Sequence, residues 1–182
     1  MNGRRQAGLL SAVLVVVGLT GSVRAMVVVP ADFSEMVAAS QTIVHGRVVD
    51  VQSYETAGRR TIESLVTVQV VEAIKGAPGG TAYFKLPGGQ VGRYRRVMIG
   101  APQCARGDEI VLFLKGNAPA VPMPFGLTQG LYRVSRDARG QATVLPMVNL
   151  GADRVVRGDP ARRPLELAAF TTLVRTIVDS RP

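Results

Sequence analysis

The sequence predicts a mainly β protein: a small OB-like barrel of about five or six strands, with a short helix before it and another helix after it. Three observations lead to this expectation. Several segments alternate between apolar and polar residues, the first two of them are long, and helical spacing occurs only near the two ends of the domain. The runner-up is a seven-stranded sandwich, which needs about two more strands than the sequence shows.

Residues 1–25 have the pattern of a cleavable export signal. Arg4 and Arg5 precede an uncharged apolar run over residues 7–19, and the sequence Val-Arg-Ala at 23–25 suits a signal peptidase. An uncleaved membrane anchor is the alternative, although the run is barely long enough for a span of about 20 residues. We therefore expect a periplasmic or extracellular protein with no membrane span after cleavage.

The remaining chain is long enough for one domain. We expect residues 26–148 to form the β-barrel and residues 149–182 to form a loop and a C-terminal helix that docks on it. Cleavage leaves 19 basic and 13 acidic side chains, a net charge of +6. Because most of the basic residues are arginines, a partner carrying carboxylate, sulfate or phosphate groups is favoured. Nucleic acid is not expected, since no ladder of base-stacking aromatic residues is evident.

The first two elements along the chain are a short helix and a kinked strand. Asp32 caps the helix, Glu35 follows three residues later, and one or two turns reach Ser40. From Thr42 the residues alternate, but the apolar face switches beside Gly46. This switch predicts a β-bulge, because one extra residue moves every later side chain to the other face.

The clearest strand follows a turn at residues 54–60. Residues 61–74 alternate regularly, and turns rich in glycine and proline then enclose a short strand at 81–86. The next stretch, residues 90–106, has no regular period.

The last strands surround a proline-rich loop. Residues 109–115 are apolar on both faces, which predicts a central strand. Prolines punctuate residues 119–124, and a terminal hairpin is expected from strands at 131–135 and 141–145. Pro164 then opens a helix with an apolar stripe that must dock on the domain: Leu167, Phe170, Leu173, Val174, Ile177 and Val178.

The segment SQTIVHGRVVDVQSYETAGRRTIESLVTVQVVEAIKG, with its long first strand, variable turn and final Lys75-Gly76 pair, resembles the first hairpin of the netrin-like domain of tissue inhibitors of metalloproteinases. The segments LPGG, GAP and GDE are similar to those of uncharacterised exported bacterial proteins. The resemblance covers roughly 100 residues and implies an OB-type fold.

The resemblance does not carry over the inhibitory residues. In those inhibitors the mature chain begins with a disulfide-bonded cysteine that chelates the catalytic zinc. Here Met26 is the expected N-terminus, and Cys104 is the only cysteine, so that no intrachain disulfide can form. Regulation of a coexported metalloproteinase remains an alternative function that the resemblance implies.

Two single residues have candidate roles. His45 is the only histidine, which excludes multi-histidine metal sites and triads, so we expect no metal site, no cofactor and no catalytic residues. His45 is either a pH-sensitive contact or a histidine satisfied within the fold. Cys104 is either a buried apolar side chain, a thiol that pairs with another chain, or the nucleophile of a weaker enzyme hypothesis.

The best candidate binding surface is rich in arginine. Two glycine-rich turns, at 57–60 and 88–92, carry or precede clustered basic residues. Such a cluster presents guanidinium groups to anions, whereas the simpler interpretation is a β-turn with a solvated basic strand. The sequence therefore predicts a noncatalytic exported module that binds an anionic glycan or an acidic protein through Arg59, Arg60, Arg93, Tyr94, Arg95 and Arg96, with His45 as a further contact.

Overall fold

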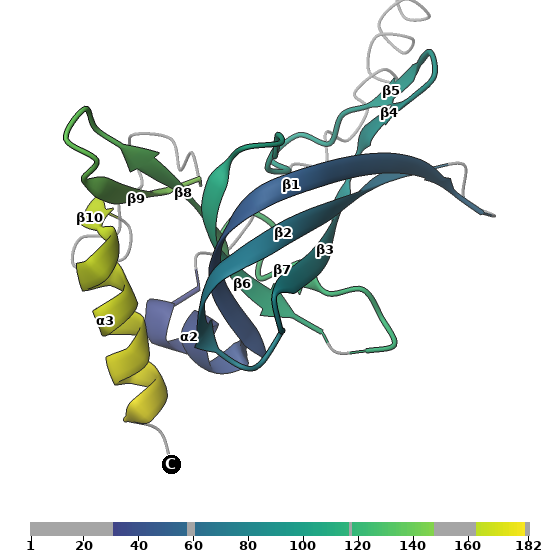
Figure 1. Ribbon diagram of the computed structural model, residues 1–182. Helices are drawn as coiled ribbons and strands as arrows, with labels where there is room; N and C mark the ends of the chain where they lie inside the picture. The colour runs from purple at the N-terminus through teal and green to yellow at the C-terminus, as the bar shows by residue number, and fades with distance from the viewer. Residues whose placement is uncertain (1–30, 58–60, 117, 148–162, 181–182) are drawn as a thin grey trace, which may run out of the picture.

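The computed structural model describes residues 31–57, 61–116, 118–147 and 163–180. The expected export signal and the predicted binding residues Arg59 and Arg60 lie outside these ranges. The described chain is mainly β, with a large antiparallel sheet, a separate two-stranded sheet and a helix near each end (Figure 1). This confirms the predicted fold class at the level of its secondary structure.

The large sheet has eight strands in the order β10-β9-β8-β6-β1-β2-β3, with β7 paired to β6. Every pairing in it is antiparallel. The strands are β1 (Thr42–Thr56), β2 (Thr61–Lys75), β3 (Thr81–Pro87), β6 (Glu109–Lys115), β7 (Met123–Pro124), β8 (Leu131–Arg136), β9 (Ala142–Pro146) and β10 (Leu165–Glu166).

The prediction of five or six strands in a closed or partly closed barrel needs correction in its number of strands, and the described part of the chain forms no closed barrel. The main sheet has eight strands, and among the described residues its ladder runs open from β10 to β3. One backbone hydrogen bond, from the Lys85 N–H to the Pro122 carbonyl (3.0 Å), joins β3 to the segment before β7. The proline-rich segment 119–124 lacks several N–H donors, so it cannot extend this contact into a full ladder.

Strand β1 is kinked beside Gly46, as predicted. Its register against β2 shifts between His45 and Gly46 and at two neighbouring points. A Cβ atom at position 46 would lie 2.5 Å from the Gln69 carbonyl oxygen, so that only glycine lets the two strands approach this closely. The bulge bends β1 and increases its local twist.

The described chain has two hydrophobic cores, and strand β6 lies between them. This confirms the predicted central position of the strand. Its alternate residues Ile110, Leu112 and Leu114 join one core, which β1, β2 and β3 complete. Val111 and Phe113 join the other core, on the opposite face of β6. The double apolar pattern of this strand is therefore explained by burial on both faces.

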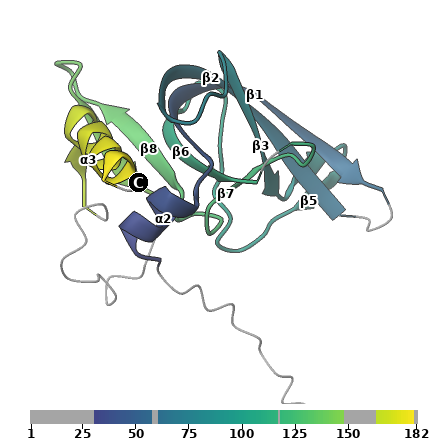
Figure 2. The ribbon, with the colours of Figure 1, turned by 90° about the horizontal axis from the view of Figure 1, so that it is seen from below.

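The two helices α2 (Phe33–Ala39) and α3 (Leu167–Asp179) cover the second core (Figure 2). Asp32 caps α2, because its carboxylate accepts the backbone N–H groups of Ser34 and Glu35. The predicted start of the last helix at Pro164 is wrong, since residues 165–166 pair with β9 before α3 begins. Four aromatic rings meet beneath the helices: Phe33, Phe113, Tyr132 and Phe170.

The predicted irregular stretch contains a second small sheet. Strands β4 (Gly89–Val91) and β5 (Tyr94–Arg96) form an antiparallel hairpin with a two-residue loop. The hairpin projects from the end of the molecule opposite α3 (Figures 1 and 2). We call residues 89–100, which include the loop that follows β5, the basic hairpin.

Candidate functional site

The basic hairpin is exposed along most of its length. Every residue from 92 to 100 is exposed to solvent. The longer segment 88–107 contains four arginines and no acidic residue. Its positive charge therefore has no internal counter-charge, which favours contact with an anionic partner.

Three arginines of the basic hairpin make no ion pair with any described residue. The Arg93 guanidinium donates a hydrogen bond to the Tyr94 hydroxyl (2.9 Å) and stacks over its ring, with Cζ 5.1 Å from the ring centroid. The side chains of Arg95 and Arg96 have no hydrogen-bond partner within the described ranges. In the rest of the described chain, by contrast, several arginines contact carboxylates: Arg47, Arg133, Arg136 and Arg175.

Large apolar side chains accompany these arginines. Tyr94 is 63% exposed, Val97 is 62% exposed and Ile99 is 94% exposed, with Met98 also at the surface. Exposed apolar residues in a cluster cost solubility and mark sites of interaction. The basic hairpin thus offers both charge and apolar surface to a partner.

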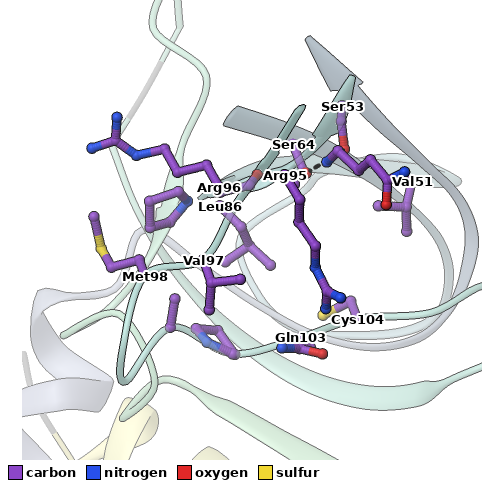
Figure 3. Close-up of a pocket in the computed structure, with 16 residues that line it drawn as sticks. Val51, Ser53, Ser64, Leu86, Arg95, Arg96, Val97, Met98, Gln103 and Cys104 are labelled. Carbon is purple, nitrogen blue, oxygen red and sulfur yellow. Dashed lines mark hydrogen bonds between the residues drawn. The ribbon is translucent and has the colours of Figure 1, made fainter. Parts of the chain in front are cut away.

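A pocket of about 390 Å³ lies at the base of the basic hairpin (Figure 3). One wall is formed by residues of the hairpin and the loop after it, and the other by β1, β2, β3 and residues 101–104. Its lining combines apolar side chains with about as much polar surface, and it holds no acidic residue. The residues that line it include Val51, Leu86, Arg95, Met98, Ala101 and Cys104.

Two serines close the pocket where the basic hairpin leaves the sheet. The Ser64 hydroxyl donates to the Gly88 carbonyl (2.8 Å) and lies 2.9 Å from the Ser53 hydroxyl oxygen, which accepts the Gln90 N–H (3.2 Å). Since the Ser64 proton is used, Ser53 donates to Ser64, and both hydroxyl protons are occupied. Gly89 lies so close to both serines that a Cβ atom at this position would clash with their hydroxyl oxygens, and its positive φ angle also favours glycine. The serines therefore fix the root of the hairpin and do not act as free donors.

The two arginines that line the pocket differ in direction. Arg95 extends across the pocket toward Gln103 and Cys104, whereas Arg96 extends away from these residues (Figure 3). Arg95 therefore supplies the positive charge of the pocket, and Arg96 adds charge to the outer surface of the hairpin.

Cys104 is a half-buried thiol in the wall of this pocket. Burial raises the pKa of the Cys104 thiol to about 12, and the nearby Asp108 carboxylate adds to the increase. A thiol with this pKa is protonated at neutral pH and is a poor nucleophile. The environment is that of an apolar side chain rather than of a catalytic cysteine.

His45 lies apart from the basic hairpin, so the structure does not unite all of the predicted binding residues. It is only 4% exposed, and its Nε2 lies 2.8 Å from Glu109 Oε1. Glu109 also accepts hydrogen bonds from Arg136 at 2.6 and 2.9 Å. These bonds lower the pKa of the Glu109 carboxyl to about 2, against the opposing effect of burial and with a smaller contribution from His45.

The sequence predicted the arginines of the basic hairpin but not the pocket beneath them. The pocket combines residues from separate strands, such as Ser53 of β1, Ser64 of β2 and Leu86 of β3, which no local motif links. Within the described part of the chain, no three potential metal ligands cluster together. Neither α2 nor α3 is long and apolar enough to span a membrane.

Comparisons with models of protein families, with curated proteins and with solved structures each found no match to this chain.

Proposed function

We propose that this protein is an exported, noncatalytic binding module that engages an acidic protein through the basic hairpin. One observation carries the proposal: Arg93, Arg95 and Arg96 are exposed and have no carboxylate partner among the described residues, on a hairpin that projects from the sheet. Exposed guanidinium groups without a carboxylate partner can bind the carboxylates of another protein with paired, charge-assisted hydrogen bonds.

The apolar part of the basic hairpin favours a protein over an anionic glycan. Tyr94, Val97 and Ile99 offer large apolar surfaces between or beside the arginines. Protein interfaces are enriched in aromatic residues, methionine and arginine, and their energy is concentrated in such side chains. A polysulfated glycan would use the arginines and leave the apolar side chains in water.

The chemistry of the pocket supports a binding role without catalysis. The hydroxyl protons of Ser53 and Ser64 are engaged, the pKa of Cys104 is high, and His45 contacts Glu109 instead of a serine or cysteine. Nucleophilic catalysis needs an activated nucleophile beside a base.

We also infer that the curled sheet is a distorted, incompletely closed OB-like and netrin-like fold. The long hairpin of β1 and β2 supports this inference. The metalloproteinase-regulator alternative rests only on the resemblance of fold. It would lose that support if mass spectrometry showed Met26 first and the purified protein left metalloproteinases uninhibited; Met26 lies outside the described residues.

Binding of poly-L-glutamate and of heparin by the purified exported protein tests this function. The double variant Arg93→Ser/Arg96→Ser removes two charges from the hairpin, and Arg139→Ser/Arg163→Ser removes two exposed charges elsewhere. We expect the hairpin variant to weaken poly-L-glutamate binding about tenfold or more at 0.1 M salt, and the control variant to bind like the wild type. If both variants lost the same poly-L-glutamate affinity, binding would depend on the net charge of the protein and not on the basic hairpin. Tighter binding of heparin than of poly-L-glutamate would point to a glycan.

A further inference from the structure

We propose that the pocket beneath the basic hairpin binds the C-terminal residue of the partner, with an apolar side chain in the cavity and its α-carboxylate on Arg95. The inference rests on the proposed function, because it names the part of the acidic protein that the same surface recognises. It goes beyond that function because binding of an acidic protein by the exposed arginines does not involve the cavity, whereas the inference assigns a specific ligand group to it.

The size and lining of the pocket fit a compact apolar group. Its volume of about 390 Å³ lies at the lower end of the range of about 300–1,000 Å³ typical of ligand sites. Val51, Leu86, Met98 and Cys104 supply apolar walls. The raised pKa of Cys104 agrees with a wall from which water is partly excluded.

The charge of the pocket favours an anion close to that apolar group. No acidic residue is among the residues that line it, and Arg95 points across the cavity with no side-chain partner in the described chain (Figure 3). Ser53 and Ser64 have no spare proton, so among the lining groups it is the Arg95 guanidinium that brings a positively charged donor across the cavity, near the Gln103 amide. Its planar fork matches the two oxygens of a carboxylate.

A C-terminal residue meets both requirements at once, because its side chain and its carboxylate are attached to the same Cα atom. An internal aspartate or glutamate presents a carboxylate without a neighbouring apolar group on the same residue. A free fatty acid has the same pair of groups as a C-terminal residue, so the experiment must separate these two sources.

The test measures fluorescence polarisation of a labelled peptide with the purified exported protein. The peptide has six aspartates followed by leucine, and it is made with a free C-terminal carboxylate or with a C-terminal amide. We expect the free acid to bind about tenfold more tightly than the amide, which corresponds to one charge-assisted contact of about 1.4 kcal/mol. Arg95→Gln should abolish this preference, and the exposed Arg139→Gln should preserve it.

A second pair of variants tests the apolar part of the site. Ala101→Phe places a ring in the wall of the pocket, while Ala138→Phe places one on the exposed turn between β8 and β9. A second peptide has glycine in place of the terminal leucine, and the wild type should bind the leucine peptide more tightly. Only Ala101→Phe should remove this preference. Circular dichroism of each variant confirms that the fold is retained.

Three results would overturn the inference in distinguishable ways. Equal binding of acid and amide, with poly-L-glutamate binding intact, rejects the pocket and leaves the function of the basic hairpin standing. Octanoate is added as a competitor in the same assay. If octanoate displaces the peptide although the acid and amide forms of the peptide bind equally, the pocket is assigned to a free fatty acid. Loss of all binding to both the peptide and poly-L-glutamate rejects the proposed function together with the inference.

Discussion

Among single residues, Glu109 joins three strands through one carboxylate. It belongs to β6, and it contacts His45 of β1 and Arg136 of β8, with Arg47 of β1 at 3.7 Å. Its side chain is 10% exposed, so removing one partner leaves charge in a region with little water. This cluster explains why His45 is buried within the run of buried residues 43–46 of β1.

The Glu109 cluster predicts a specific dependence of stability on pH. The carboxyl has a pKa of about 2 in the folded chain and about 4.5 as its ordinary value, so its contribution is complete above pH 4.5 and is lost as the pH falls toward 2. Glu109→Gln should lower the free energy of unfolding by about 1–2 kcal/mol at pH 7. The difference from the wild type should shrink toward zero at pH 2 in urea titrations; a difference that is constant with pH would contradict this role.

Cys104 gives a second prediction for a single residue. Its folded pKa of about 12, against an ordinary value of 9.0, reduces the thiolate fraction at pH 8 on the order of 1,000-fold. Alkylation by iodoacetamide should therefore be at least tenfold slower in native protein than in urea, as measured by mass spectrometry. Equal rates in the two states would show that the thiol is solvated and available to another chain.

Sequence reasoning could define the alternatives for His45 and Cys104 but could not choose between them. The carboxylate partner of His45 is 64 positions away in the chain, and the environment of Cys104 depends on strands that are remote in sequence. Arg93, Arg95 and Arg96 were accessible from the sequence because they are adjacent and lack acidic neighbours. Local charge is visible in a sequence, whereas burial by distant segments is not.

At the scale of elements, β1 contributes side chains to both cores. Val44 and Val48 face the core shared with β2 and β3, and Ile43 faces the core beneath the helices. Neighbouring residues of a strand point to opposite faces, and residues 42–47 of β1 pair with β6 without a register shift, so ordinary alternation separates these roles. The register shift beside Gly46 is against β2, and the switch of the apolar face in the sequence predicted it.

Gly46→Ala should therefore destabilise the pairing of β1 with β2. The new methyl group would lie 2.5 Å from the Gln69 carbonyl oxygen and 2.6 Å from Val68 Cγ1, and the first of these atoms belongs to the backbone. We expect a loss of about 2 kcal/mol or more in the free energy of unfolding, measured by urea denaturation. The control Gly79→Ala has open space at its Cβ position, although its positive φ angle carries a smaller cost. A smaller effect at position 46 than at position 79 would contradict the proposed close approach.

The success of prediction for each element depended on its length. Strands β1 and β2 have 15 residues each, so their alternation is clear, and the stripe of α3 spans several turns. Strands β7 and β10 have two residues each, and β4 and β5 have three, which is too short for a period to appear. These short strands are formed by pairing with neighbours, so the predicted loop at 119–124 and the irregular stretch at 90–106 needed correction.

At the scale of the whole molecule, the core beneath the helices and the candidate binding surface are at different ends. The helices and the aromatic cluster of Phe33, Phe113, Tyr132 and Phe170 lie toward one end, and the basic hairpin projects from the other (Figures 1 and 2). Substitutions on the exposed hairpin therefore leave the core intact, which makes binding separable from folding.

Hydrogen exchange of the protein with and without poly-L-glutamate shows whether the basic hairpin is the binding surface. If it is, backbone amides at residues 92–100 exchange more slowly on binding, and amides of α3 and of the β8–β9 turn are unchanged. Protection of α3 or the β8–β9 turn, with residues 92–100 unaffected, would contradict this role of the basic hairpin.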